Sequence, residues 1–119
     1  MDNEKIRVNV QKEGQVSIIF INGELTLLDA PDLKQILDTI LETGIHRFLF
    51  DFEQLDFIDS SGISILLRFH AQLTKLDGKI GFVNFHKNVA NTMHKALPLY
   101  IREKAYFENA QEALKYLNS

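Results

Sequence analysis

The sequence predicts an α/β fold in which about four helices cover a mixed β-sheet, in the order ββαβαβα(β)α. Segments rich in β-branched and aromatic residues alternate along the chain with segments that have the apolar spacing of amphipathic helices. The first two strand segments are too close in sequence for a crossover, so they predict an antiparallel hairpin, whereas the later strands are expected to be parallel. The 119 residues fit a single domain, residues 1–119.

The hairpin comes first. Residues 6–10 alternate apolar and polar side chains, and Lys12-Glu13-Gly14 has the composition of a turn. The second strand, residues 16–21, is apolar on both faces, which predicts an interior position in the sheet. We expect this strand to end at Asn22-Gly23.

An amphipathic helix follows the hairpin. Asp29 is its candidate N-cap, Pro31 suits its first turn, and Gly44 ends it. Its apolar stripe has the spacing of one helix face and consists of Leu33, Ile36, Leu37, Ile40 and Leu41. Residues 47–52 then predict a buried strand.

The second half of the chain repeats this alternation. It predicts a helix over 61–76 that stops at Asp77-Gly78, a strand over 79–85, a short helix over 88–97 closed by Pro98, and a brief edge strand over 105–107. The last helix begins at the candidate cap Asn109, and Glu112 completes a capping-box pattern. Its apolar side consists of Ala113, Leu114 and Leu117.

Composition excludes several classes of protein. With 13 basic and 16 acidic residues the net charge is −3, which argues against a dedicated nucleic-acid binder. The absence of cysteine excludes disulfides, thiolate metal sites and a cysteine nucleophile. The N-terminus lacks the pattern of a signal peptide, and no segment approaches the roughly 18 apolar residues of a membrane span. We therefore expect a cytoplasmic protein with no stable membrane insertion.

Motifs of catalysis are missing as well. His46, His70, His86 and His94 have no metal-ligand spacing, so no metal site is expected. There is neither a G-x-S-x-G elbow nor a glycine-rich phosphate loop, so the sequence predicts no cofactor and no enzyme activity. Asp51 follows an apolar strand as in a phospho-accepting receiver domain, but no acidic pair follows the first strand to bind magnesium. We interpret Asp51 and Glu53 as residues that cap or solvate a strand end.

The informative segment is residues 55–67, LDFIDSSGISILL, which enters a helix through Asp59, Ser60, Ser61 and Gly62. One interpretation is structural, because a serine or an aspartate before a helix is a preferred N-cap and glycine permits a tight entry. However, one serine is enough to cap. If Ser61 is the cap, the Ser60 hydroxyl lies free at the positive end of the helix, where a phosphate would meet unpaired N–H groups. Which serine is the cap stays open at this point.

Residues 51–63, together with Gly23-Glu24-Leu25, resemble the STAS domain of bacterial anti-sigma-factor antagonists. The resemblance covers nearly the whole chain in length and element order. It implies partner switching, in which the unmodified antagonist binds an anti-sigma factor that is also a serine kinase and so frees the sigma factor. It further implies that this kinase phosphorylates Ser60, which ends binding, and that a PP2C-type phosphatase restores the antagonist.

The resemblance also implies where the partner binds. The residues expected at that surface are Thr26, Leu27, Asp56, Asp59, Ser61, Gly62 and Ile63. Three positions differ from the usual family pattern, in which an aspartate follows Gly-Glu-Leu and positions 64 and 68 are often glycine. This chain has Thr26, Ser64 and Arg68 there. These differences bear on which partner is bound and leave the phosphoacceptor unchanged.

Two groups of apolar residues have alternative interpretations. We call Asp59-Ser60-Ser61-Gly62 the serine turn. Leu27 and Leu28 are either core residues or apolar contacts beside this turn. The helix after Gly62 has more apolar residues than one stripe needs, so either its buried side is broad or Ile65 or Phe69 forms an exposed docking patch.

The alternative function is a STAS module that never switches, such as a scaffold in a stress complex or an accessory subunit of lipid transport.

Overall fold

A computed structural model describes residues 6–97 and 105–119 of the chain. Within these residues the structure has a five-stranded mixed sheet and four helices, and this confirms the predicted fold class. The strands are β1 (Arg7–Glu13), β2 (Val16–Leu25), β3 (Arg47–Asp51), β4 (Leu55–Ile58) and β5 (Lys79–Val83). The helices are α1 (Ala30–Glu42), α2 (Ser60–Lys75), α3 (Lys87–Ala96) and α5 (Ala110–Leu117).

The sheet has the order β1-β2-β3-β5. β1 and β2 form the predicted antiparallel hairpin, in which Glu13 pairs with Val16 and Gly14 has a positive φ of 62°. β2 is parallel to β3 over its first half and parallel to β4 over its second half. It is therefore the central strand, as its apolar sequence predicts.

The strands differ from the prediction at three places. β2 does not end at Asn22-Gly23 but continues to Leu25, because Gly23, with a φ of 107°, takes up a register shift in the pairing with β4. The short strand β4 was not predicted at all. The proposed edge strand over 105–107 is a single bridge between Tyr106 and Phe82. The predicted helix stop at Pro98 lies outside the described residues.

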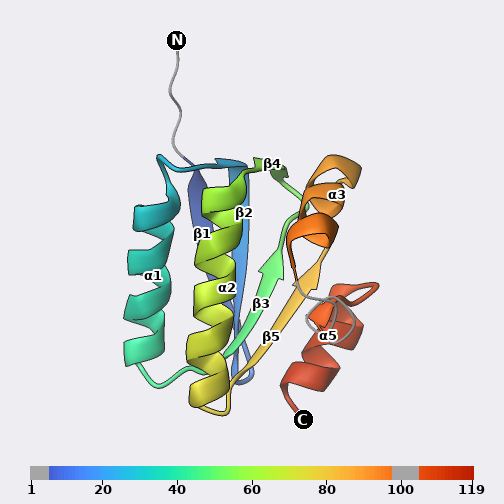
Figure 1. Ribbon diagram of the computed structural model, residues 1–119. Coiled ribbons are helices and arrows are strands. Elements are labelled where there is room, and N and C mark those ends of the chain that lie inside the picture. Colours follow the sequence, from blue (N-terminus) through green and yellow to red (C-terminus); the bar gives the residue numbers. More distant parts are fainter. Residues whose placement is uncertain (1–5, 98–104) are drawn as a thin grey trace.

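Helices cover both faces of the sheet. α1 and α2 lie side by side over one face (Figure 1), and α5 packs on the opposite face against β3 and β5. The core under α2 is rich in phenylalanine, with Phe48 edge-on to Phe69 at 4.7 Å between ring centroids and Phe50 stacked on Phe82 at 5.5 Å. The two layers therefore hold β3 and β5 between them.

The helix ends agree with the predicted signals in part. Asn109 caps α5, because its side chain accepts a hydrogen bond from the Glu112 N–H at 2.9 Å. Asp29 occupies the N-cap position of α1, but its side chain makes no capping bond there. It instead accepts a hydrogen bond from the Ile6 N–H at 3.4 Å, so it ties the start of β1 to the loop before α1.

We expect His70 on α2 to make the protein less stable in mild acid. Partial burial lowers the pKa of His70 below its ordinary value of 6.5. As the pH falls through about 6.5, the His70 imidazole becomes protonated in the unfolded chain while it is still neutral in the folded chain. The free energy of unfolding therefore decreases. Below the folded pKa this contribution becomes constant. Melting temperatures at pH 7.5 and pH 5 should therefore differ less in His70→Gln than in the wild type, and an equal difference would contradict the prediction.

Candidate functional site

The serine turn connects β4 to α2 at the carboxyl end of the parallel strands. The N-cap of α2 is Asp59. Its backbone is extended, and its Oδ1 accepts a hydrogen bond from the Gly62 N–H at 3.0 Å. Neither serine is therefore the cap, in contrast to the alternatives that the sequence left open. The Asp59 carboxylate already supplies the acceptor that a capping serine would provide.

Ser60 and Ser61 are the first two residues of α2. The helical hydrogen bonds begin with the Ile63 N–H, which donates to the Asp59 carbonyl at 3.1 Å, and the Gly62 N–H is taken by the Asp59 side chain. The N–H groups of Ser60 and Ser61 thus point out of the helix end without an intrahelical acceptor. Ser60 is exposed and Ser61 is half-buried, so the Ser60 side chain is the more accessible of the two.

Gly62 lets α2 approach the ends of two strands. A Cβ at this position would lie 2.8 Å from side-chain carbons of both Leu25 and Ile58, and 3.0 Å from the Leu25 carbonyl oxygen. Leu25 and Ile58 are themselves buried, so neither has room to move away. Gly62 is therefore needed for packing. It is buried, so it offers a partner little surface.

Asp59 also joins the serine turn to the loop between β2 and α1. Its Oδ2 accepts a hydrogen bond from the Leu27 N–H at 3.1 Å, and its own N–H donates to the Leu25 carbonyl at 3.1 Å. The loop is closed by the Thr26 carbonyl, which accepts from the N–H groups of Asp29 and Ala30 at 3.0 Å each. The Asp59 carboxylate thus fixes the loop after β2 against the serine turn, although the two segments are more than thirty residues apart in the chain.

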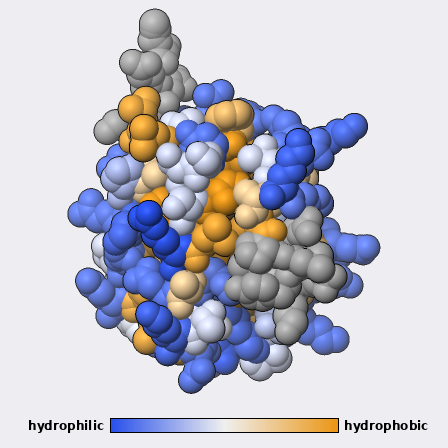
Figure 2. All heavy atoms as spheres, in the orientation of Figure 1, coloured by the Kyte–Doolittle hydropathy of each residue, from blue (hydrophilic) through white to orange (hydrophobic). Residues whose placement is uncertain are grey.

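Apolar side chains are exposed next to this turn. Leu27 is 68% exposed and Leu28 is 80% exposed, so both lie outside the core. Phe57 on β4 is 45% exposed, and its neighbour in the sheet is Glu24 on β2. Figure 2 shows apolar surface at the top of the molecule, above the beginning of α1. We call Leu27, Leu28 and Phe57 the apolar rim of the serine turn.

Other predicted contacts lie inside the protein. Ile63, expected at the partner surface, is 3% exposed, so this expectation needs correction: its side chain packs in the core. Ile65 and Phe69 are buried in the same core, which excludes the docking patch on α2 and leaves a broad buried side. Arg68 is exposed, but it lines a shallow depression between α1 and α2 with residues such as Lys34.

The segment that leads into the serine turn, residues 53–58, is held by residues that the sequence did not single out. The Asn88 side chain donates to the carbonyl of Asp56 at 2.6 Å, and an imidazole nitrogen of His86 contacts the carbonyl of Glu53. His86 is the N-cap of α3 and Asn88 lies in its first turn, so the start of α3 holds β4 and the residues just before it. The Asp56 side chain remains exposed. No signal in the sequence links positions 53 and 56 to positions 86 and 88.

Asp51 has a structural environment that fits a strand-end residue. Its Oδ1 accepts a hydrogen bond from the Glu53 N–H and its Oδ2 accepts one from the Asn84 side chain, both at 3.1 Å. Both carboxylate oxygens are therefore used for local structure. Within residues 6–97 and 105–119, no three metal-ligating side chains come together. In the same ranges, no helix has the length and apolar character needed to cross a membrane.

Comparison with known proteins identifies the family. The STAS domain family matches residues 7–113, so the chain belongs to the STAS domain family. The fold is similar to an anti-sigma factor antagonist from Mycobacterium paratuberculosis, with a TM-score of 0.84 and 20% identity over 99% of this chain and 98% of that one.

Two further structures extend the comparison. The phosphorylated form of the Bacillus cell fate determinant SpoIIAA has a TM-score of 0.73 and 18% identity over 92% of this chain and 98% of that one. A sulfate transporter family protein from Wolinella succinogenes has a TM-score of 0.69 and 26% identity over 87% of this chain and 84% of that one. The fold is thus shared by an anti-sigma factor antagonist and a sulfate transporter family protein.

Proposed function

We propose that this protein is an anti-sigma factor antagonist that acts by partner switching. In its unphosphorylated form it binds an anti-sigma factor with serine kinase activity and so releases a sigma factor. The kinase then phosphorylates Ser60, the complex separates, and a PP2C-type phosphatase restores the antagonist. In this proposal the protein is a cytoplasmic binding module and the two partner enzymes supply the chemistry.

One observation carries the proposal: Ser60 is an exposed first-turn serine whose capping role is already filled by Asp59. A phosphate on Ser60 would therefore replace no structural hydrogen bond of the fold. It would lie near the N–H groups of Ser60 and Ser61 and the positive end of α2, which favour an anion. The carboxylate of Asp59 opposes this attraction, so the phosphate is not clamped onto the helix and stays available to repel a partner.

The apolar rim supports the same proposal. Leu27, Leu28 and Phe57 give a partner surface to bury next to Ser60. Phosphorylation adds about −1.5 to −2 charges, which changes the net charge of −3 to about −5. A partner packed on the rim would have to remove water from this dianion, so the same surface binds one form and rejects the other.

Intact-mass spectrometry tests the phosphorylation step. The protein is incubated with ATP and each candidate anti-sigma kinase encoded in the same genome. We expect one added phosphate, which Ser60→Ala abolishes, Ser61→Ala retains, and a PP2C-type phosphatase removes. Absence of phosphate with every cognate kinase, or its retention in Ser60→Ala, would contradict the proposal.

A second candidate function is a STAS module that does not switch and serves a transporter. The 26% identity to the sulfate transporter family protein favours this alternative. The two functions differ in their gene neighbourhood and in their partners. A neighbouring gene for a kinase-like anti-sigma factor supports switching, whereas a transporter operon and copurification with a membrane transporter support the accessory role.

A further inference from the structure

The edge strand β1 has one side without a partner in the sheet. It pairs with β2 alone among the described strands, so the backbone N–H and C=O groups along its other side have no sheet partner there. All of its seven residues except Val8 are exposed. It contains neither proline nor a bulge, two of the features that often prevent another strand from pairing with an edge. Its charged residues, Arg7, Lys12 and Glu13, lie toward its two ends and leave Val8 to Gln11 uncharged.

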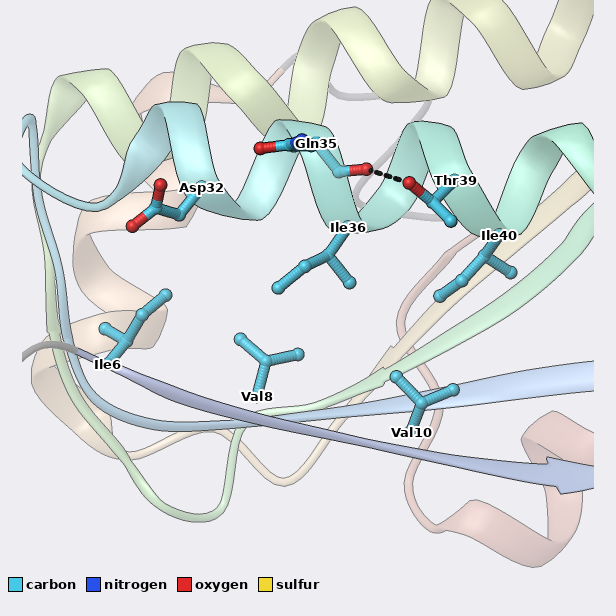
Figure 3. A pocket seen from close by; sticks show the side chains of 8 residues that line it. All are labelled: Ile6, Val8, Val10, Asp32, Gln35, Ile36, Thr39 and Ile40. Atoms are coloured by element: carbon cyan, nitrogen blue, oxygen red, sulfur yellow. Dashed lines mark hydrogen bonds between the residues drawn. The ribbon is translucent and has the colours of Figure 1, made fainter.

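An apolar groove runs along this same strand. It lies between β1 and α1 and has a volume of about 610 Å³. Figure 3 shows Val8 and Val10 pointing from β1 toward α1, while Ile36 and Ile40 point from α1 toward β1. Val10 remains 45% exposed. The apolar faces of strand and helix therefore leave space between them at the edge of the sheet.

We propose that this edge binds an extended segment of a partner protein, which adds to β1 as a further strand. The backbone edge would bind the main chain of the segment, and the groove would receive every second side chain. The segment should thus have apolar residues opposite Val8 and Val10. On the other face, Arg7 and Glu13 stand near the two ends of β1 and favour an acidic and a basic residue respectively.

A second copy of this protein is a poorer occupant than a single strand. Two β1 strands paired around a two-fold axis would lie about 4.8 Å apart. Each copy has α1 above its own β1, as Figure 3 shows, so the two α1 helices would be brought to a similar separation. Packed helices need about 8–10 Å between their axes. A strand without its own covering helix avoids this collision.

Binding of a designed peptide to the unphosphorylated protein tests the proposal. The probe is fluorescein-labelled KVTVTIE-amide, which in antiparallel pairing places a basic residue opposite Glu13, apolar residues opposite Val10 and Val8, and an acidic residue opposite Arg7. We expect saturable binding by fluorescence anisotropy. Val10→Lys should weaken it about tenfold or more, because the new charge enters the groove. The matched variant Asn9→Lys adds the same charge on the other face of β1 and should bind nearly as well as the wild type.

Several results would contradict binding at β1. Equal affinity of both lysine variants would place binding elsewhere, and no binding at millimolar peptide with folded protein would refute the proposal. The peptide KVTVTIK places a lysine opposite Arg7 in both antiparallel and parallel pairing, so it should bind more weakly than the probe. If light scattering shows a dimer that Val10→Lys alone dissociates, the occupant is a second copy and the proposal is wrong. No kinase or anti-sigma factor is used, so failure here leaves the proposed function of Ser60 unaffected.

Discussion

Replacing Gly62 with valine is expected to lower the free energy of unfolding by about 3 kcal/mol, at the upper end of the usual cost of overpacking. Even a single Cβ would lie 2.8 Å from carbons of Leu25 and Ile58, and valine adds two methyl groups beyond it. Both neighbours are buried at the ends of β2 and β4, so relief requires α2 to move away from the sheet. Urea denaturation of the purified variant measures the loss.

Ser64→Val is the matched control for this prediction. It introduces the same β-branched residue into the same helix, at a position that is half-buried. Valine has a better helix propensity than glycine and about the same as serine, so helix propensity predicts no loss in either variant. The collision with Leu25 and Ile58 occurs in Gly62→Val alone. Similar losses in the two variants would show that placing valine in α2, not the close approach at position 62, sets the cost.

The serine turn shows what the sequence could and could not predict at this site. Four small or polar residues in a row before an apolar segment are typical of a helix start, and they located the turn to within one residue. Which of Asp59, Ser60 and Ser61 is the cap depends on a contact outside the segment. The Asp59 side chain is held by the Leu27 N–H as well as by Gly62, and periodicity carries no information on that long-range hydrogen bond.

The errors in the sheet have a similar origin. Asn22-Gly23 has the composition of a turn, yet Gly23 uses its positive φ to change register inside a continuing strand. β4 has four residues, of which only the first and last are buried, so its pattern is too short to indicate a strand. Its pairing with the end of β2 specifies it instead. The long elements, whose apolar residues repeat over several turns or fill a strand, were predictable.

Exposure was the least predictable property of the site. Leu27 and Leu28 are as apolar as the core residues of α1, and the sequence allowed both a buried and an exposed position. They are exposed because the loop that carries them is held away from the core by Thr26 and Asp59, whose hydrogen bonds fix its backbone. Conversely, Ile63 follows the serines directly, but the helix turns it inward. Proximity in sequence to Ser60 thus does not determine which residues a partner can reach.

Ser60→Asp is expected to weaken binding of the anti-sigma factor at least tenfold while changing the melting temperature little. Stability should hold because Asp59, not Ser60, caps α2, and because an acidic residue in the first turn is compatible with the helix dipole. Affinity should fall because a partner that buries the apolar rim must desolvate the new carboxylate or leave it unpaired. A real phosphate carries more charge, and a loss of about 3 kcal/mol on phosphorylation corresponds to roughly 150-fold in affinity.

Ser60→Asn separates charge from shape in this experiment. Asparagine has nearly the same size as aspartate and is uncharged, so it should retain most of the affinity if electrostatic desolvation is the mechanism. Isothermal titration calorimetry with the cognate anti-sigma factor would give the dissociation constants of the wild type, Ser60→Asp and Ser60→Asn. Equal weakening by asparagine and aspartate would mean that Ser60 lies in a tight steric contact rather than at a charge switch. A large fall in melting temperature for both would instead assign Ser60 a structural role that the capping geometry of Asp59 does not predict.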